Sequence, residues 1–159
     1  MQYSLLATVV CATIALPAMA ADVTYRNDIA PLFKAQCADC HSSEAKAPTL
    51  QEYKLDQKKY DKEKVGPRTD TYENLVMLIA YPDSGALMRR LDDGTGKFAG
   101  GKPGNMYKNL GSTDAERVKN LATVKAWLGE GAWNLNRWNQ KGDVPGITKE
   151  EQAKLILKY

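Results

Sequence analysis

The segment Cys37-Ala-Asp-Cys40-His41 constrains this sequence more than any other. The chain has three cysteines, and because Cys11 lies in an apolar leader, only Cys37 and Cys40 remain outside it. His41 is the single histidine of the 159 residues. On a helical segment, positions three and four residues apart share one face. The fold of this chain is therefore expected to present two thiols and one imidazole on the same side of a helix.

This C-x-x-C-H pattern predicts the covalent attachment of one haem. Two thiols at that spacing can add to the two vinyl groups of haem, and the next imidazole then reaches the iron as proximal ligand. The alternatives are a disulfide between the two cysteines, a thioredoxin-like redox motif and a zinc site. No strand pattern precedes Cys37, and outside the leader no further Cys or His exists to complete a zinc site. The motif thus favours haem c held by Cys37, Cys40 and His41.

The N-terminal residues 1–20 read as a secretory signal peptide. They carry no charged side chain, and the apolar run Leu5–Leu16 is followed by the small-residue exit Ala18-Met-Ala20. An apolar run that ends in an A-x-A pattern is typical of exported proteins. We therefore predict cleavage near Ala20 and a periplasmic location, where a covalent tether would keep haem from being lost. No second apolar run is long enough to span a bilayer, so no stable membrane insertion is expected after signal removal.

Composition narrows the fold class and the kinds of partner. The net charge is +3 and is evenly spread, which disfavours nucleic-acid binding. Charged residues make up 26% and hydrophobic ones 43%, so a folded chain is expected. With two Phe and few β-branched residues, a β-sandwich is disfavoured. The length fits one domain, and we predict an all-α fold with a modest core.

Hydrophobic spacing and capping signals predict the helices of this fold. The first runs from about 27 or 28 to 41, with Asp28 as its cap, and no helix is predicted in the polar stretch 51–68, which ends in the breaker pair Gly66-Pro67. The glycine-rich stretch 92–104 is expected to be irregular. The other expected helices cover 71–81 with Asp70 and Glu73 as capping pair, 84–91, 113–129 with Thr113 and Glu116, and 148–159 with Thr148 and Glu151.

Methionine is the natural soft ligand for the sixth position of the iron. The chain offers three outside the leader: Met77, Met88 and Met106. Met77 and Met88 lie in apolar helical stretches, where packing in the core is the ordinary role of methionine. Met106 lies in a glycine-rich loop, where core packing explains it poorly and where a backbone can drape over a haem face. All three stay candidates, and Met106 is favoured.

The sequence resembles a class I monohaem cytochrome c of the exported bacterial kind. In that family a helix ends in C-x-x-C-H, helices and a loop with the axial methionine follow, and a last helix packs across the first. The resemblance covers most of the chain after the leader. It runs through Tyr25–Phe33, Cys37–His41, Ser84–Leu91, Met106 and Val124–Ala132.

This resemblance implies a cytochrome c-like helical fold wrapped around one covalently attached haem. The domain would cover residues 21–133, with a C-terminal extension, 134–159, packed on it. By position, Met106 matches the axial methionine of the family. Pro48 stands where the family has a proline whose backbone carbonyl accepts the N–H of the proximal histidine, His41 in this chain. Such an acceptor fixes the orientation of the imidazole.

The function that follows is a one-electron shuttle with His/Met axial ligands, and not an enzyme, because no second histidine is present as a base. The alternatives are a five-coordinate haem sensor or peroxidase-like protein, and a haem subunit of a larger respiratory complex. Redox proteins are the expected partners of a monomeric chain, and the lysine-rich run Lys54–Lys64 is either a docking face or a solvated surface. Trp127 is expected to pack against Phe33, and Trp133 and Trp138 are expected to complete the core.

Overall fold

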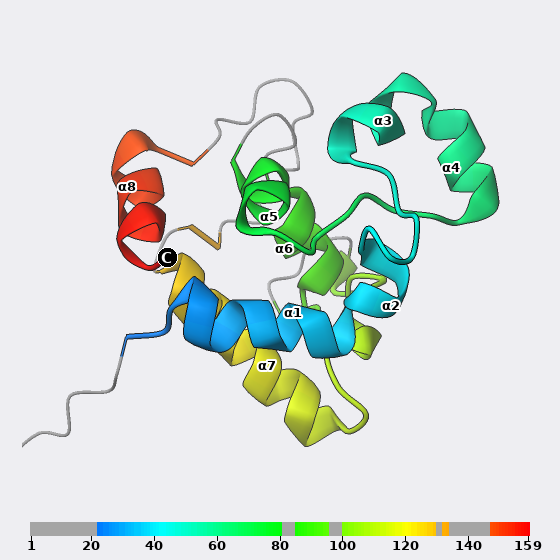
Figure 1. Cartoon of the computed structure of the whole chain (residues 1–159). Coiled ribbons are helices and arrows are strands. Elements are labelled where there is room, and N and C mark those ends of the chain that lie inside the picture. Colours follow the sequence, from blue (N-terminus) through cyan, green and yellow to red (C-terminus); the bar gives the residue numbers. More distant parts are fainter. Residues whose placement is uncertain (1–21, 81–84, 96–99, 130–131, 134–146) are drawn as a thin grey trace, which may run out of the picture.

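The computed structural model describes residues 22–80, 85–95, 100–129, 132–133 and 147–159 (Figure 1). These residues form helices and loops and contain no strand, so the prediction of an all-α fold is confirmed. The proposed signal peptide 1–20, Trp138 and the connection 134–146 lie outside the described residues. Within them, none of the helices combines the length and the apolar character needed to cross a membrane.

The first helical segment covers the predicted range but is divided into three. It consists of a π-helical turn η1 (Tyr25–Ile29), then α1 (Ala30–Gln36) and α2 (Ala38–His41). The cap is Thr24, whose hydroxyl accepts the N–H of Asn27, while Asp28 reaches back to accept the N–H of Thr24 at 2.8 Å. The prediction of Asp28 as the cap was therefore wrong, since the cap lies one turn earlier, at Thr24. The carboxylate of Asp28 still takes part in the capping, because it accepts the N–H of Thr24.

Two short helices occupy the polar stretch in which the sequence analysis predicted none. They are α3 (Leu50–Leu55) and α4 (Gln57–Glu63), which form a helical hairpin at one side of the molecule (Figure 1). Thr49 and Glu52 cap α3 reciprocally, and Asp56 caps α4. Of the residues in these two helices only Leu50 is buried, so the hairpin adds little to the core.

The remaining helices agree with the predicted ones to within a few residues. In α5 (Tyr72–Ile79) the cap is Thr71 instead of Asp70, because the hydroxyl of Thr71 accepts the N–H of Asn74. The next helix is α6 (Ala86–Leu91), and the 3-10 turn η3 (Tyr107–Asn109) follows the glycine-rich stretch. The predicted capping boxes open α7 (Asp114–Leu128) and α8 (Lys149–Leu157), and both are confirmed.

The core lies where α7 crosses the first helical segment, with α8 beside it (Figure 1). Trp127 of α7 is fully buried, and its ring centroid lies 6.1 Å from that of Tyr25 and 6.4 Å from that of Tyr72. Phe33 belongs to the same buried cluster. Leu155 of α8 joins it too, and just after this helix the ring of Tyr159 stacks on that of Tyr25 and the carbonyl of Lys158 accepts the N–H of Tyr25.

Candidate haem site

The C-x-x-C-H residues form a single tight turn at the end of the first helical segment. The N–H groups of Cys40 and His41 both donate to the carbonyl of Cys37, at 3.2 and 2.9 Å. Cys37 has φ of −125°, so the break between α1 and α2 falls on the first cysteine of the motif. Cys37 is half-buried, Cys40 is exposed, and the two thiols are free instead of joined in a disulfide.

The electrostatic surroundings of Cys37 disfavour thiolate chemistry. Burial raises the pKa of the Cys37 thiol to about 12, and the neighbouring Cys40 adds to the rise. Reactive and metal-binding cysteines have lowered pKa values, because the thiolate is the nucleophile and the ligand. In the described part of the chain, moreover, no three His, Cys, Asp or Glu side chains converge to hold a metal ion, as a zinc site requires.

The imidazole of His41 is fixed by the backbone of a distant loop. Its Nδ1 donates to the carbonyl of Pro67, with 2.8 Å between the two atoms. This bond commits Nδ1 as the protonated nitrogen, so Nε2 is left with a lone pair available for iron. Pro48, which the family resemblance implied as this acceptor, does not fill that role: its carbonyl accepts the N–H of Arg68, at 2.8 Å.

Gly66 brings the Pro67 carbonyl into reach of His41. A Cβ placed on Gly66 would lie 2.7 Å from Cε1 of the imidazole, which is closer than such atoms approach in real structures. Any side chain at this position would displace either the ring or the loop. The residues that orient His41 are thus Pro67, through its carbonyl, and Gly66, through its lack of a side chain. From the sequence, this pair was interpreted only as the end of a polar stretch. A Gly-Pro pair after the motif was the signal available for finding it.

The three candidate axial methionines occupy different environments. Met88 is fully buried on α6 as part of the core cluster. Met77 is half-buried on α5, and its Sδ accepts a hydrogen bond from the amide of Gln51 at 3.4 Å. Met106 is half-buried too but lies outside the helices, just before η3. The packing role expected of Met88 is therefore observed, whereas Met77 and Met106 keep part of their surface exposed.

Backbone contacts with the end of α6 hold the loop that carries Met106. The N–H of Met106 donates to the carbonyl of Arg90 at 2.9 Å. Two residues earlier, a Cβ on Gly104 would come within 2.3 Å of the carbonyl oxygen of Arg89 and 2.4 Å of that of Arg90. The Sδ of Met106 accepts from the side-chain amide of Asn109, at 3.5 Å. The side chain of Arg90 also reaches the loop, donating to Oδ1 of Asn105 at 3.1 Å, so α6 holds the loop through both backbone and side chain.

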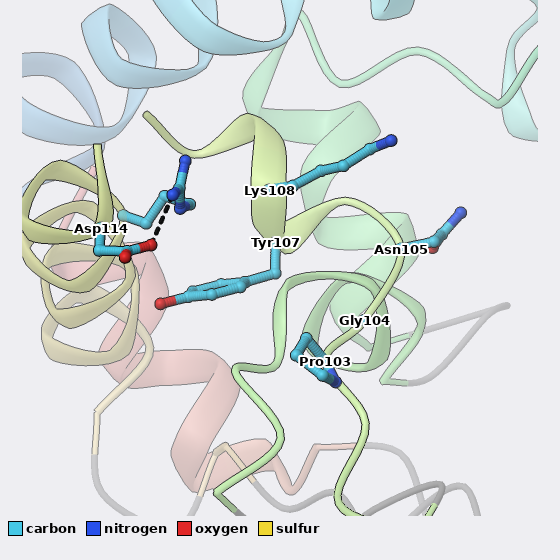
Figure 2. Close-up of a pocket in the computed structure, with 7 residues that line it drawn as sticks. Pro103, Gly104, Asn105, Tyr107, Lys108 and Asp114 are labelled. Carbon is cyan, nitrogen blue, oxygen red and sulfur yellow. Dashed lines mark hydrogen bonds and ion pairs between the residues drawn. The ribbon is translucent and has the colours of Figure 1, made fainter. Parts of the chain in front are cut away.

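An open pocket of about 530 Å³ lies beside the Met106 loop. Figure 2 shows the ring of Tyr107 extending from η3 toward Asp114 of α7, which forms an ion pair with Arg117. The C-x-x-C-H residues do not line this pocket, so it lies apart from the proposed haem attachment site. Its lining residues are Pro103, Gly104, Asn105, Tyr107, Lys108, Asp114 and Arg117.

The residues of the motif fit a covalently bound haem. Two free thiols lie one helical turn apart, and the adjacent imidazole has its Nδ1 proton engaged by Pro67 and its Nε2 available. Gly66 leaves the space beside the ring that the imidazole needs in this orientation. Cys37 and Cys40 would hold the porphyrin, and His41 would supply one axial ligand.

Comparisons with known proteins agree with this chemistry. The family model described as PccH cytochrome c matches residues 24–159. Among solved structures, the monohaem cytochrome PccH from Geobacter sulfurreducens shares 48% sequence identity. That alignment covers 87% of this chain and 99% of the other, with a TM-score of 0.66. No curated protein matched the sequence.

Both matches extend well beyond the C-x-x-C-H motif. The family model covers the whole described helical region, including α8, and the solved structure is matched over nearly its full length. At this identity and coverage, the fold and the cofactor of the family carry over to this chain. The chain therefore belongs to the PccH cytochrome c family, as a monohaem cytochrome c with one covalently bound haem c and electron transfer as its chemistry.

Proposed function

We propose that the protein is an exported one-electron carrier whose haem is attached through Cys37 and Cys40, with His41 and Met106 as axial ligands. The observation that carries this proposal is the hydrogen bond between His41 Nδ1 and the Pro67 carbonyl. It fixes an imidazole with Nε2 available directly beside two free thiols. Carbonyl acceptors of this kind orient metal-bound histidines and increase their donor strength.

Haem supplies a one-electron Fe(III)/Fe(II) couple, and the protein residues set the conditions for it. His41 and Met106 would fill both axial positions, which leaves none for a substrate. Because His41 is the single histidine, no second imidazole is available as an acid or base. Outer-sphere electron transfer is then the simplest chemistry, and a carrier is favoured over an enzyme.

Met106 is proposed as the distal ligand because of its loop and its surroundings. It lies between the end of α6 and α7, and the half-buried side chain packs partly against the core. Met88 is less suited, since its side chain is fully buried among core residues. Met77 is the remaining alternative, because its sulfur too is partly exposed and accepts a side-chain amide.

The periplasm is the proposed location, on the basis of the signal-like residues 1–20. Redox proteins are the proposed partners of the monomer. The α3–α4 hairpin is a reasonable docking surface, because it offers exposed lysines around Leu55, which is 87% exposed. The run Lys54–Lys64 carries five lysines against three acidic residues, and a surface of net positive charge is suited to a partner with an acidic rim.

An absorption spectrum of the purified protein tests the proposal directly. We expect low-spin spectra in both oxidation states and, in the oxidised form, the weak charge-transfer band of Met–iron bonding. The denatured chain should keep the mass of one haem, which tests the thioether links separately. A high-spin protein that binds carbon monoxide readily would instead support a five-coordinate sensor or peroxidase-like function. Gel filtration distinguishes a free carrier from a subunit of a larger complex.

A further inference from the structure

The carboxylate of Asp70 joins three segments next to the proximal histidine. Its Oδ2 accepts the backbone N–H of Ser43 at 2.8 Å. Its Oδ1 accepts the side-chain amide of Asn74 at 2.9 Å and lies 3.4 Å from Nε of Arg68. These hydrogen bonds lower the pKa of the Asp70 carboxyl, against the raising effect of its partial burial.

Asp70 is itself held on a fixed support. Asn74 is buried in α5, and its own N–H donates to the hydroxyl of the helix cap Thr71. The backbone of Asn74 is thus fixed at the start of the helix, and its buried side chain carries the amide that holds Asp70. Side chains whose partners are locked in this way position other groups with precision.

The bond between His41 and Pro67 joins the same two segments as the contact between Ser43 and Asp70: the one that starts at the end of the C-x-x-C-H motif and the one that follows Gly66. The carbonyl of His41 accepts the N–H of Thr69 at 2.8 Å, which pairs the two backbones on one side. Ser43 follows His41 by two residues, and Arg68 follows Pro67 by one. Asp70 thus adds a second link between the two segments, beside the Thr69 bond, while the N–H of Arg68 donates to the carbonyl of Pro48.

We propose that Asp70 is a positioning residue for the proximal ligand. By tying the segment after His41 to the segment after Pro67, it keeps the Pro67 carbonyl on Nδ1 of the imidazole. This inference rests on the proposed function, in which His41 binds the haem iron. A carbonyl on Nδ1 increases the donor strength of the ring, which favours the oxidised iron and lowers the reduction potential. Loss of the Asp70 contacts should therefore raise the reduction potential.

The test compares Asp70→Ala, Asp70→Asn and the control Asp28→Ala in the haem-loaded protein. Asp28 also accepts a backbone N–H at 2.8 Å, from Thr24 at the start of the first helical segment. Two quantities are measured: the reduction potential, and the exchange of the His41 Nδ1 proton with solvent, by NMR. For Asp70→Ala we expect a higher potential and exchange faster by about fivefold or more, the factor that one ordinary hydrogen bond gives.

Asp70→Asn separates positioning from charge. The amide oxygen can accept the N–H of Ser43, but the NH2 group then faces the donor amide of Asn74 and that bond is lost. Proton exchange should therefore quicken less than in Asp70→Ala, while the loss of charge raises the potential slightly. Equal shifts in potential for both Asp70 variants, with unchanged proton exchange, would show that only the charge matters and would overturn the proposal. So would an equal effect of Asp28→Ala. If Asp70→Ala does not fold, Asn74→Ala replaces it, because it removes one of the donors that hold Asp70. We then expect a smaller rise in the reduction potential and a smaller rise in the exchange rate of the Nδ1 proton.

A failure of the proposed function would look different from a failure of this inference. If His41 is not the proximal ligand, the wild-type spectrum itself lacks the low-spin form. If His41 binds iron but Asp70 does not position it, the wild-type spectrum is low-spin and the exchange rate of the Nδ1 proton does not respond to Asp70→Ala.

Discussion

The two proposed axial ligands are held in different ways. His41 is fixed by a segment more than twenty residues further along the chain, through the Pro67 carbonyl, the Thr69 N–H and the contacts of Asp70. Met106 depends on its own neighbourhood: the backbone of α6 and the amide of Asn109, three residues away. Both sides thus depend on tertiary contacts, but those of the proximal side reach further along the chain, whereas those of Met106 come from the adjoining helix α6 and from the residues just after it.

This difference suggests separate tasks for the two sides. A histidine held by a distant segment keeps its orientation as long as the fold persists, so its donor strength is a property of the whole domain. A methionine held by a loop can be lost by changes that leave the fold intact. We therefore expect substitutions on the distal side to change the spin state of iron, and those on the proximal side to shift its potential.

The largest effect is expected for Met106→Ala. Removal of the thioether opens the distal position, so the iron becomes high-spin, carbon monoxide binds the reduced form, and the reduction potential falls. The expected fall exceeds about 60 mV, which is a tenfold change in the one-electron equilibrium. Met88→Ala is the control: it should cost about 2–5 kcal/mol in unfolding free energy as a core truncation and leave the spectrum low-spin. Loss of the Met–iron band in Met88→Ala or Met77→Ala, with Met106→Ala unchanged, would contradict the ligand assignment.

Gly104→Ala should displace the loop that carries Met106 while leaving the methionine side chain itself unchanged. The new methyl group would meet the carbonyls of Arg89 and Arg90, so the loop must move away from α6. We expect a weakened Met–iron band and a loss of about 1–3 kcal/mol in unfolding free energy, as for other overpacked sites. Gly100→Ala is the comparison, because a Cβ there meets nothing within 4 Å and only its φ of +72° opposes the change. An intact Met–iron band in Gly104→Ala would show that the loop contacts with α6 do not position Met106.

Gly66→Ala is the matching change on the proximal side. Its Cβ would press on Cε1 of His41 and move the Pro67 carbonyl off Nδ1. The spectrum should stay low-spin while the reduction potential rises, because the imidazole becomes a weaker donor. Redox titration with spectral monitoring measures both at once. Conversion to high spin would mean that the two sides are not separable in the way proposed here.

Asn109→Ala should produce a smaller and opposite shift. The amide of Asn109 withdraws electron density from the sulfur of Met106, so its removal strengthens the sulfur as a donor to oxidised iron. We expect the reduction potential to fall by about 20–40 mV, the equivalent of one weak hydrogen bond. Gln51→Ala is a matched control, because Gln51 makes the same kind of bond to Met77, at 3.4 Å. If Gln51→Ala shifts the potential and Asn109→Ala does not, Met77 is the better candidate for the axial ligand.

The smallest effect on haem is expected for Thr49→Ala. It removes the hydroxyl that caps α3 and should lower the unfolding free energy by about 1 kcal/mol. Because the hairpin contributes only Leu50 to the core, the spectrum and the reduction potential should be unchanged. A measurable shift in potential would indicate that the hairpin is coupled to Pro67 through the bond between Pro48 and Arg68.

The sequence predicted those features that depend on neighbouring residues. The C-x-x-C-H spacing predicted the attachment chemistry, and the capping boxes at Thr113 and Thr148 predicted the starts of α7 and α8. The same signal was present at Thr49, where Glu52 completes a capping box. The helix was not predicted because the stretch is polar and, with almost no buried residue, shows no apolar spacing.

Features that depend on distant contacts were not predictable in this way. Pro48 and Pro67 both follow the motif, and the chain of α3 and α4 between them decides which carbonyl reaches His41. Likewise, Asp70 was expected to cap α5, because the spacing to Glu73 fits a capping pair. Its carboxylate instead turns toward Ser43, a partner that only the folded backbone brings near.

The bond between the N–H of Tyr25 and the carbonyl of Lys158 has a consequence for the order of folding. It joins residues near the two ends of the described chain, and contacts so far apart in sequence form late and slowly. The start of the first helical segment therefore completes its packing only when the residues after α8 are present, with Tyr159 stacked on Tyr25. In the export that we propose, the segment that holds the two cysteines would cross the membrane well before the residues that pack on its start. The topology thus leaves an interval in which the thiols are accessible on an incompletely folded chain, as the addition of haem to them requires.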